Sequence, residues 1–255
     1  MSSEIKTNFT GPRRDYEAWA LTQRPDSATL EYIRSVPTAF VSDCLKRLEI
    51  RNHALRDVRL AYDMPGKQVS IAGAAITMQW APHSEVRPYF ESPYLHTQVV
   101  EQARAGDVIV IAGMGAPYGF WGEHASNQAI NQGVQGIVID GYTRDIKPIR
   151  KSGLCVFSTG VTFESYVRRF DPVGFNTTVS VAGAMVRPGD VMMGDDDGVL
   201  VIPQEIVGKV AEVAADIERL EVDLGEAVKA GVPWSDIYRD IHHRKYYQTK
   251  PLPKF

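Results

Sequence analysis

The amino-acid sequence predicts an α/β sandwich whose sheets mix parallel and antiparallel strands. In the middle of the chain, short apolar runs bounded by glycines alternate with segments of helical spacing. Beyond residue 178 the strand-like runs follow one another directly and are joined by tight turns. Alternation of strands and helices favours parallel pairing, whereas tight turns favour antiparallel pairing. We therefore expect one compact domain with mixed sheets and not a doubly wound fold.

Helical spacing recurs at intervals along the first 150 residues. Residues 1–27 are polar and are expected to form an N-terminal arm, after which a helix begins near Ser27. A second helix is predicted over 38–48, because Thr38 can cap it and the apolar residues that follow have helical spacing. Further helices are predicted over residues 94–105, 121–132 and 147–151.

Strands are expected where short apolar and β-branched runs lie between turn residues. These runs are residues 69–80, 108–111, 136–140, 156–158, 179–181, 184–186, 191–193 and 199–202. Residues 112–119 are expected to form a loop. A long helix is predicted over 205–230, with a narrow apolar seam formed by Ile206, Val210, Val213, Ile217, Leu220 and Leu224. Such a seam is typical of a surface helix or a subunit contact, so we do not expect a monomer.

The composition excludes several classes of protein. The chain has 255 residues, 44% of them hydrophobic, and its net charge of −3 provides no basic field for nucleic acid. Cys44 and Cys155 lack metal-ligand spacing, so a reduced pair is expected. No apolar run approaches the roughly 20 residues of a membrane helix, and the N-terminus lacks the apolar core of a secretory signal. These features predict a cytoplasmic protein with no membrane or nucleic-acid partner.

The most informative stretch is residues 136–145, which read Gly-Ile-Val-Ile-Asp-Gly-Tyr-Thr-Arg-Asp. Its apolar half predicts a buried strand, and the loop after such a strand commonly presents functional side chains. Arg144 offers a planar cation suited to a carboxylate or phosphate, and Asp145 offers oxygen ligands suited to Mg²⁺ or Mn²⁺. A site with both can hold an acidic substrate and polarise its carbonyl group. The alternative is that the two residues form a solvated surface pair.

A second candidate feature is the start of the helix predicted from residue 121, where the sequence reads Trp-Gly-Glu-His-Ala. The free N–H groups of a helix N-terminus can hold a carboxylate, and Gly122 allows a ligand to approach the backbone closely. The helix runs back along the sheet into the strand before Arg144, so Glu123 and Arg144 can meet on one rim. Alternatively, Glu123 only complements the helix dipole, and His124 is a surface residue.

Two further patterns do not match the motifs that they suggest. Residues 113–119 contain closely spaced glycines, but Tyr118 stands where a dinucleotide-binding loop needs its third glycine, and Pro117 lacks an N–H. The run Asp195-Asp196-Asp197-Gly198 lacks the glutamate that closes a calcium loop, so we expect a charged turn. The sequence also contains no Gly-x-Ser-x-Gly elbow that would support serine-hydrolase chemistry.

The spacing of the candidate residues resembles the signature of a known family. Twenty residues separate Glu123 from Arg144, and Asp145 follows at once; this is similar to the Asp-x20-Arg-Asp signature of class II pyruvate aldolases of the RraA-like family. Members of this family cleave 4-hydroxy-4-methyl-2-oxoglutarate or 4-carboxy-4-hydroxy-2-oxoadipate and also decarboxylate oxaloacetate. Matching elements occur at residues 73–77, 106–110, 136–141, 187–190 and 195–199, within a resemblance that spans residues 38–218.

The resemblance implies a fold and an assembly. The expected fold is a three-layer β/β/α sandwich of the swivelling-domain type, formed by residues 28–218, with residues 219–255 as the end of the C-terminal helix and a tail. The expected assembly is a homotrimer or a homohexamer with the active site between subunits. The family also contains a regulator that binds a ribonuclease and in which the Arg-Asp pair is incomplete; the complete pair here favours an enzyme.

The resemblance also implies roles for individual residues. Asp145 would bind the divalent metal, Mg²⁺ or Mn²⁺, and Arg144 would bind the substrate carboxylate or keto oxygen. The substrate carboxylate would also meet the backbone N–H groups of the helix start, which comprises Gly122, Glu123, His124 and Ala125. Glu123 stands where the family has Asp, and this replacement bears on which oxo acid is used. In the reaction expected here, the base would be a water held either by the metal or by Glu123.

The reaction implied by the resemblance is the cleavage of a 2-oxo acid that carries a second carboxylate. The products would include pyruvate, formed through a metal-stabilised enolate, and oxaloacetate decarboxylation would be a side activity of the same chemistry. Two alternatives stay open. The chain could be a non-catalytic interaction protein, or it could use the same metal site to hydrate or isomerise an oxo acid.

Overall fold

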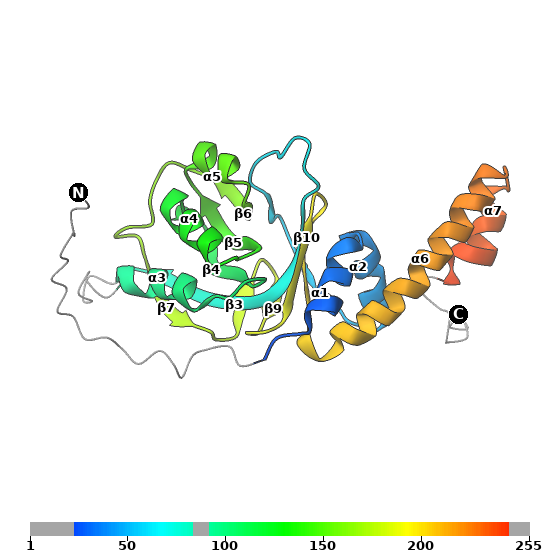
Figure 1. The fold of residues 1–255 in the computed structure, drawn as a ribbon, viewed down its shortest axis with the longest axis horizontal. Helices are drawn as coiled ribbons and strands as arrows, with labels where there is room; N and C mark the ends of the chain where they lie inside the picture. The colour runs from blue at the N-terminus through cyan, green and yellow to red at the C-terminus, as the bar shows by residue number, and fades with distance from the viewer. Residues whose placement is uncertain (1–22, 84–91, 245–255) are drawn as a thin grey trace.

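The computed structural model describes residues 23–83 and 92–244 and confirms an α/β fold with a mixed sheet (Figure 1). Nine strands form one sheet in the order β1-β11-β10-β3-β4-β5-β6-β2, with β7 paired to β3, and β8 and β9 form a separate hairpin. The strands are β1 (Ala54–Leu55), β2 (Arg59–Leu60), β3 (Ser70–Pro82), β4 (Val108–Trp121), β5 (Gly136–Thr143), β6 (Cys155–Val161), β7 (Phe170–Phe175), β8 (Val179–Val181), β9 (Ala184–Val186), β10 (Val191–Asp195) and β11 (Gly198–Ile202).

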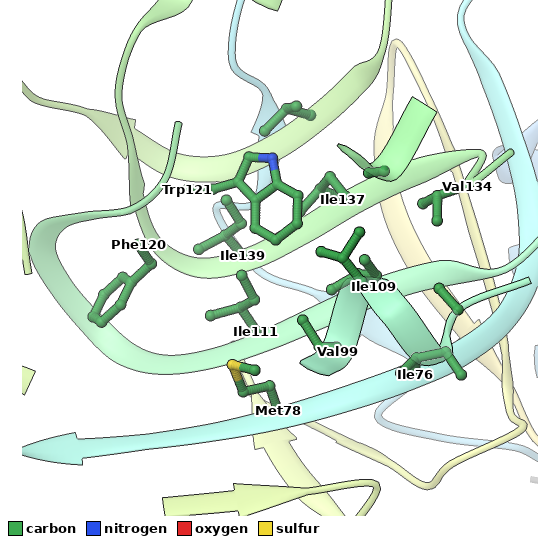
Figure 2. Packing of buried hydrophobic residues seen from close by; sticks show 14 of the residues in the cluster. Ile76, Met78, Val99, Ile109, Ile111, Phe120, Trp121, Val134, Ile137 and Ile139 are labelled. Carbon is green, nitrogen blue, oxygen red and sulfur yellow. The ribbon is translucent and has the colours of Figure 1, made fainter. Parts of the chain in front are cut away.

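Helices pack against two parts of this sheet. Against β3, β4, β5 and β6 lie α3 (Ser92–Gln102), α4 (Glu123–Asn131) and α5 (Ile146–Ser152). Figure 2 shows this core, in which Phe120, Trp121 and Ile137 are almost completely buried. The layer formed by β10 and β11 is covered instead by α1 (Ser27–Ser35), α2 (Thr38–Arg47) and α6 (Val207–Lys229).

Strand β10 shows how the layers are stacked. Met192 lies in the core between the β layers, together with Val110 of β4 and Val181 of β8. Its neighbours Val191 and Met193 pack instead with α1, α2 and α6. Because successive side chains of a strand point to opposite faces, β10 is buried on both sides. The predicted β/β/α sandwich is therefore present, with a further helical layer over β10 and β11.

Strand β3 joins the antiparallel and parallel parts of the sheet. Its first residues, Ser70 to Ala74, pair antiparallel with β10, and the next five, Ala75 to Gln79, pair parallel with β4. The parallel order then continues through β5 and β6. The carboxyl ends of these three neighbouring strands consequently meet at one edge of the sheet, where a site is expected in an open parallel sheet.

Strand β4 is longer than the sequence predicts. The predicted loop over 112–119 is wrong, because these residues continue the strand to Trp121 with three shifts of register against β5. Met114 and Gly115 have positive φ angles of 61° and 66°, a left-handed conformation typical of bulges. The glycines in this stretch therefore mark bulges within a strand and not its end.

Strand β7 is not predicted from the sequence at all. Pro172 and Gly174 interrupt its apolar pattern, and neither residue favours the interior of a sheet. β7 pairs with β3 alone, however, and its register shifts between Gln79 and Trp80. An edge position and a bulge are the two situations in which a strand tolerates proline, so tertiary pairing decided the structure here.

The acidic turn between β10 and β11 caps a helix and confirms the predicted charged turn. Asp195 accepts hydrogen bonds from the Thr38 backbone N–H at 2.8 Å and from the Thr38 hydroxyl at 2.6 Å. It also accepts the backbone N–H of Asp197 at 2.9 Å. Thr38 is thus the first residue of α2 and not its capping residue, and a carboxylate distant in sequence satisfies the free N–H at the helix start.

The apolar seam of α6 is buried within the chain. Val210, Val213 and Ile217 pack with α1 and α2, and Leu220 and Leu224 are only 6% and 7% exposed. The following segments, α7 (Trp234–Ile237) and the π-helix η3 (Tyr238–His242), fold back onto α6. The expectation of an exposed seam is therefore wrong, because the chain covers the seam itself; the predicted oligomer no longer has this support and stays a prediction. No helix in the described part of the chain is both long and apolar enough to cross a membrane.

The two ends of the chain lie partly outside the described residues. Of the predicted arm, residues 1–22 fall outside them, but Arg24 makes a bidentate ion pair with Asp107, with both N–O distances at 2.7 Å. This pair ties residues just before α1 to the turn that precedes β4. The predicted division between residues 218 and 219 falls inside the continuous helix α6, and the tail from 245 onward lies outside the described residues.

The buried His53 makes the stability of this fold sensitive to pH. Its Nε2 lies 3.1 Å from the hydroxyl of Ser42 in α2, and burial lowers its pKa below the ordinary value of 6.5. Below that value the unfolded chain binds more protons than the folded chain, so the free energy of unfolding falls as the pH falls toward the lowered pKa. We expect urea titrations to show that the free energy of unfolding decreases less between about pH 7 and about pH 5 in His53→Gln than in the wild type. Equal losses would contradict this assignment.

Candidate active site

The parallel pairing of β4 and β5 brings the two candidate segments together. Trp121, the last residue of β4, lies opposite Thr143, the last residue of β5. The carbonyl oxygen of Trp121 accepts the Arg144 backbone N–H at 2.9 Å and the Thr143 hydroxyl at 3.1 Å. Gly122 and Glu123 therefore start α4 beside Arg144 and Asp145, as the sequence predicts. We call Gly122, Glu123, Arg144 and Asp145 the Arg–Asp corner.

Asp145 is the central residue of the Arg–Asp corner. It precedes α5 with φ 59° and ψ 38°, a left-handed conformation that aspartate tolerates better than most residues. Its Oδ2 accepts the backbone N–H of Glu123 at 3.2 Å, and its Oδ1 accepts Nε of Arg144 at 3.2 Å. The side chain remains 33% exposed. These contacts orient a carboxylate that still has free lone pairs and access to solvent.

Glycines make room for the two charged side chains. A Cβ atom at position 122 would lie 2.6 Å from Oδ2 of Asp145, and one at position 119 would lie 2.9 Å from Cγ of Arg144. Any larger residue would therefore displace the carboxylate or the guanidinium stem. Gly122 was expected to allow a ligand to approach the backbone closely; in the structure the nearest atom at this position is Oδ2 of Asp145.

The start of α4 is held in place by its own side chains. The indole Nε1 of the buried Trp121 donates to the Ser126 hydroxyl at 2.9 Å, and that hydroxyl donates to the carbonyl of Gly122 at 2.9 Å. These bonds fix the first turn of the helix next to Asp145. The N–H groups of this turn are consequently preorganised for a negative group, because a helix N-terminus favours anions.

An open hollow of about 450 Å³ adjoins the Arg–Asp corner. The residues that line it are Arg144, Asp145, Ile146, Val161, Thr162 and Phe163. Arg144 and Asp145 form its charged side. Val161 and Phe163, which are 49% and 92% exposed, form an apolar side. Residues 161–163 were not predicted to belong to the site, because the predicted strand ends at residue 158. Their position after a strand that is parallel to β5 is the signal that could have found them.

The predicted substrate-binding residues lie beside this hollow. Gly122, Glu123 and Ala125 are partly buried, and His124 is exposed. None of these four is among the described residues that line the hollow. Glu123 reaches Asp145 through its backbone N–H. The structure thus places Glu123, Arg144 and Asp145 together, and the catalytic and metal-binding roles of these residues remain predictions.

The donors at the Arg–Asp corner fit a hard divalent cation. Among the described residues, no cluster of three or more His, Cys, Asp or Glu side chains forms a complete ligand set. Mg²⁺ does not need one, because it is usually held by one or two carboxylates and completes its shell with water or substrate oxygens. Asp145, whose two oxygens accept hydrogen bonds from the Glu123 N–H and from Nε of Arg144, supplies such a carboxylate at a solvent-accessible wall.

The fold and the Arg–Asp corner define a class of α/β sandwich proteins with a paired guanidinium and carboxylate at the carboxyl edge of the sheet. The chain belongs to the RraA-like family, because the family model, described as Aldolase/RraA, matches residues 38–201. This match contains the whole corner and confirms the family that the sequence resembles.

Two relatives show how far this likeness extends. A protein of Halalkalibacterium halodurans named "Putative 4-hydroxy-4-methyl-2-oxoglutarate aldolase" is 27% identical over 202 residues, covering 77% of this chain and 89% of that protein. Protein DlpA of Legionella pneumophila is 28% identical over 197 residues. That match covers 75% of this chain but only 31% of DlpA, so the chain corresponds to about a third of the larger protein.

Solved structures confirm the fold. An uncharacterized protein from Pseudomonas syringae superimposes with a TM-score of 0.71 at 26% identity, covering 84% of this chain and 98% of that chain. RraAS2 from Streptomyces coelicolor, described as an unusual member of the RNase ES inhibitor RraA protein family, gives a TM-score of 0.70 at 28% identity, covering 78% and 96%.

Proposed function

We propose that this chain is a divalent-metal-dependent lyase that cleaves a carbon–carbon bond of a 2-oxo acid to release pyruvate and also decarboxylates oxaloacetate. The observation that carries the proposal is the Asp145 carboxylate, oriented by the Glu123 N–H and the Arg144 guanidinium on the wall of an open hollow. The aldolase name of the Halalkalibacterium relative supports the same reaction class.

Asp145 is the residue that would hold Mg²⁺ or Mn²⁺. A divalent ion at this position supplies Lewis-acid stabilisation for the negative charge that develops on the 2-keto oxygen of the substrate. Arg144 adds a fixed positive charge beside it and binds the substrate carboxylate or keto oxygen. A preorganised donor of this kind lowers a reaction barrier by roughly 3–4 kcal/mol.

Glu123 and the start of α4 complete the proposed chemistry. The first turn of α4, over Gly122 to Ala125, binds a substrate carboxylate through the N–H groups that do not donate to Asp145. A water held by Glu123 accepts the proton of the C4 hydroxyl while the C3–C4 bond breaks and its electron pair passes to C3. Protonation at C3 then yields pyruvate. Oxaloacetate needs no such base, because carbon dioxide leaves directly, so its decarboxylation uses the same charge stabilisation.

A second candidate function is that of a non-catalytic regulator. The likeness to RraAS2, whose description places it in an RNase inhibitor family, favours it. That function requires a stable complex with a partner protein and no metal-dependent turnover. For either function we propose a cytoplasmic homotrimer or homohexamer, an assembly that rests on the family resemblance.

Metal removal tests the lyase proposal. Pyruvate release from oxaloacetate, followed by coupling to lactate dehydrogenase, is expected to fall to the rate without enzyme when EDTA is added. Excess Mg²⁺ or Mn²⁺ is expected to restore it. Because metal ions also promote the uncatalysed reaction, each condition needs a blank with metal and no enzyme. Turnover that EDTA leaves unchanged would contradict the proposal, and turnover equal to the blank throughout would favour the regulator.

A further inference from the structure

We infer, on the basis of the proposed lyase function, that the preferred substrate is a 2-oxo acid with an apolar substituent on C4, held by Phe163 and Val161. The hollow beside the Arg–Asp corner has two chemically different sides. Arg144 and Asp145 lie on one side, and Val161 and Phe163 lie on the other. A ligand that fills both sides must be charged at one end and apolar at the other.

The backbone around Phe163 is anchored to the strands that carry the site. The N–H of Thr162 donates to the carbonyl of Thr143 at 2.9 Å, directly before Arg144. On the other side, the carbonyl of Glu164 accepts the N–H of Gly119 at 2.8 Å, and the N–H of Glu164 donates to the Thr162 hydroxyl at 3.1 Å. The residue between these anchors is therefore held at a defined place beside the hollow.

The ring of Phe163 is nevertheless 92% exposed. A large aromatic side chain gains free energy when a ligand covers it. A phenyl ring on an anchored loop next to a site is well placed to gain that energy from a bound ligand, because little further ordering of the loop is needed. Val161, 49% exposed at the end of β6, extends the same apolar surface.

The charges of the hollow disfavour a second carboxylate on this side. Among the described residues that line it, Arg144 is the only cation, and its Nε already donates to Asp145. A carboxylate placed against Phe163 and Val161 would meet no cation from the described residues on this side, whereas an apolar group there would cover the exposed ring. The second carboxylate expected from the family resemblance is therefore replaced by an apolar group in the substrate that this chain prefers.

The test compares two substrates that differ in the C4 substituent. 4-Hydroxy-2-oxo-4-phenylbutanoate carries a phenyl group and 4-hydroxy-2-oxoglutarate carries a carboxylate; both release pyruvate by the same bond cleavage, with benzaldehyde or glyoxylate as the other product. Pyruvate is measured by chromatography with Mg²⁺ present. The wild type is expected to have the higher kcat/KM for the phenyl substrate. Hydrophobic pocket contacts discriminate by roughly 10- to 200-fold, so we expect Phe163→Ala to lower that value at least about tenfold.

Matched variants and a third substrate separate the possible outcomes. Phe163→Leu is expected to keep more of the activity on the phenyl substrate than Phe163→Ala does. Met185→Ala, which removes another large exposed apolar side chain, on β9, is expected to leave that activity unchanged. Oxaloacetate decarboxylation by Phe163→Ala is expected to fall by a smaller factor than cleavage of the phenyl substrate, because oxaloacetate carries no phenyl group for the ring of Phe163 to contact.

Three results would overturn this inference. One is a preference of the wild type for the dicarboxylate, and another is an unchanged preference in Phe163→Ala. The third is loss of oxaloacetate decarboxylation in Phe163→Ala together with a smaller particle in size-exclusion chromatography, which would show that Phe163 is covered by a second copy of the chain. Absence of metal-dependent oxaloacetate decarboxylation in the wild type itself would instead reject the proposed lyase function.

Discussion

Replacing Asp145 with asparagine is expected to lower kcat/KM for metal-dependent pyruvate release from oxaloacetate by at least about 100-fold. Loss of a residue that only supports a metal ligand already costs about 10- to 100-fold, and Asp145 is the proposed ligand itself. The substitution removes the negative charge and leaves one acceptor oxygen for two donors, the Glu123 N–H and Nε of Arg144. Initial rates at several Mg²⁺ concentrations measure the effect.

Asparagine is the appropriate replacement because it tolerates the left-handed conformation of position 145, whereas alanine would add backbone strain. The matched control is Asp57→Asn, since Asp57 is exposed on the turn between β1 and β2, does not line the hollow, and has a similar φ of 60°. We expect the control to keep full activity and both variants to remain folded by circular dichroism. If Asp145→Asn retains wild-type kcat/KM, Asp145 does not hold an essential metal.

Replacing Gly73 with alanine is expected to lower the free energy of unfolding by about 3 kcal/mol or more, the upper range for overpacking a core. A Cβ atom at this position would overlap the carbonyl oxygen of Gly106 and would lie 3.1 Å from Cγ2 of Val108. Neither the backbone of β3 at Gly73 nor the turn at Gly106 can easily move away. Gly73 pairs with Met192 of β10, and Gly106 belongs to the turn that starts β4. Urea unfolding followed by circular dichroism measures the change.

The control for this prediction is Gly225→Ala in the interior of α6. A Cβ atom there meets no heavy atom within 4 Å. Alanine is the better helix former by about 1 kcal/mol, so this variant should be slightly more stable than the wild type. A Gly73→Ala protein as stable as the wild type would mean that the Gly106 turn can shift, and that β3 and β4 are less rigidly packed than the structure indicates.

The Arg–Asp corner could be predicted from the sequence because its geometry follows from local patterns. Residues 136–140 are a short apolar run after a glycine, and residues 108–111 are another, so both predict buried strands. If two such strands are parallel neighbours, their carboxyl ends coincide, and the residues that follow them must meet. The observed pairing of Trp121 with Thr143 is the result.

Other features of the site depend on contacts that no local pattern encodes. Nothing in the sequence around Asp145 shows that its carboxylate bonds to the start of α4, or that Gly122 makes room for it. The prediction of a loop over 112–119 was wrong for a related reason, because glycines are typical both of bulges within a strand and of loops that end a strand. Only the pairing with a neighbouring strand shows whether such glycines form a bulge or a loop.

By itself, the sequence determined most of the helices and buried strands, which family the chain resembles, and which charged residues end the parallel strands. These properties follow from hydrophobic periodicity and turn chemistry within short windows. Tertiary structure alone decided that α6 buries its apolar seam inside the chain and that Val161 and Phe163 form the apolar side of the hollow. The physical reason is that burial and pocket shape depend on which distant segments pack together, and that choice is made by the free energy of the whole fold.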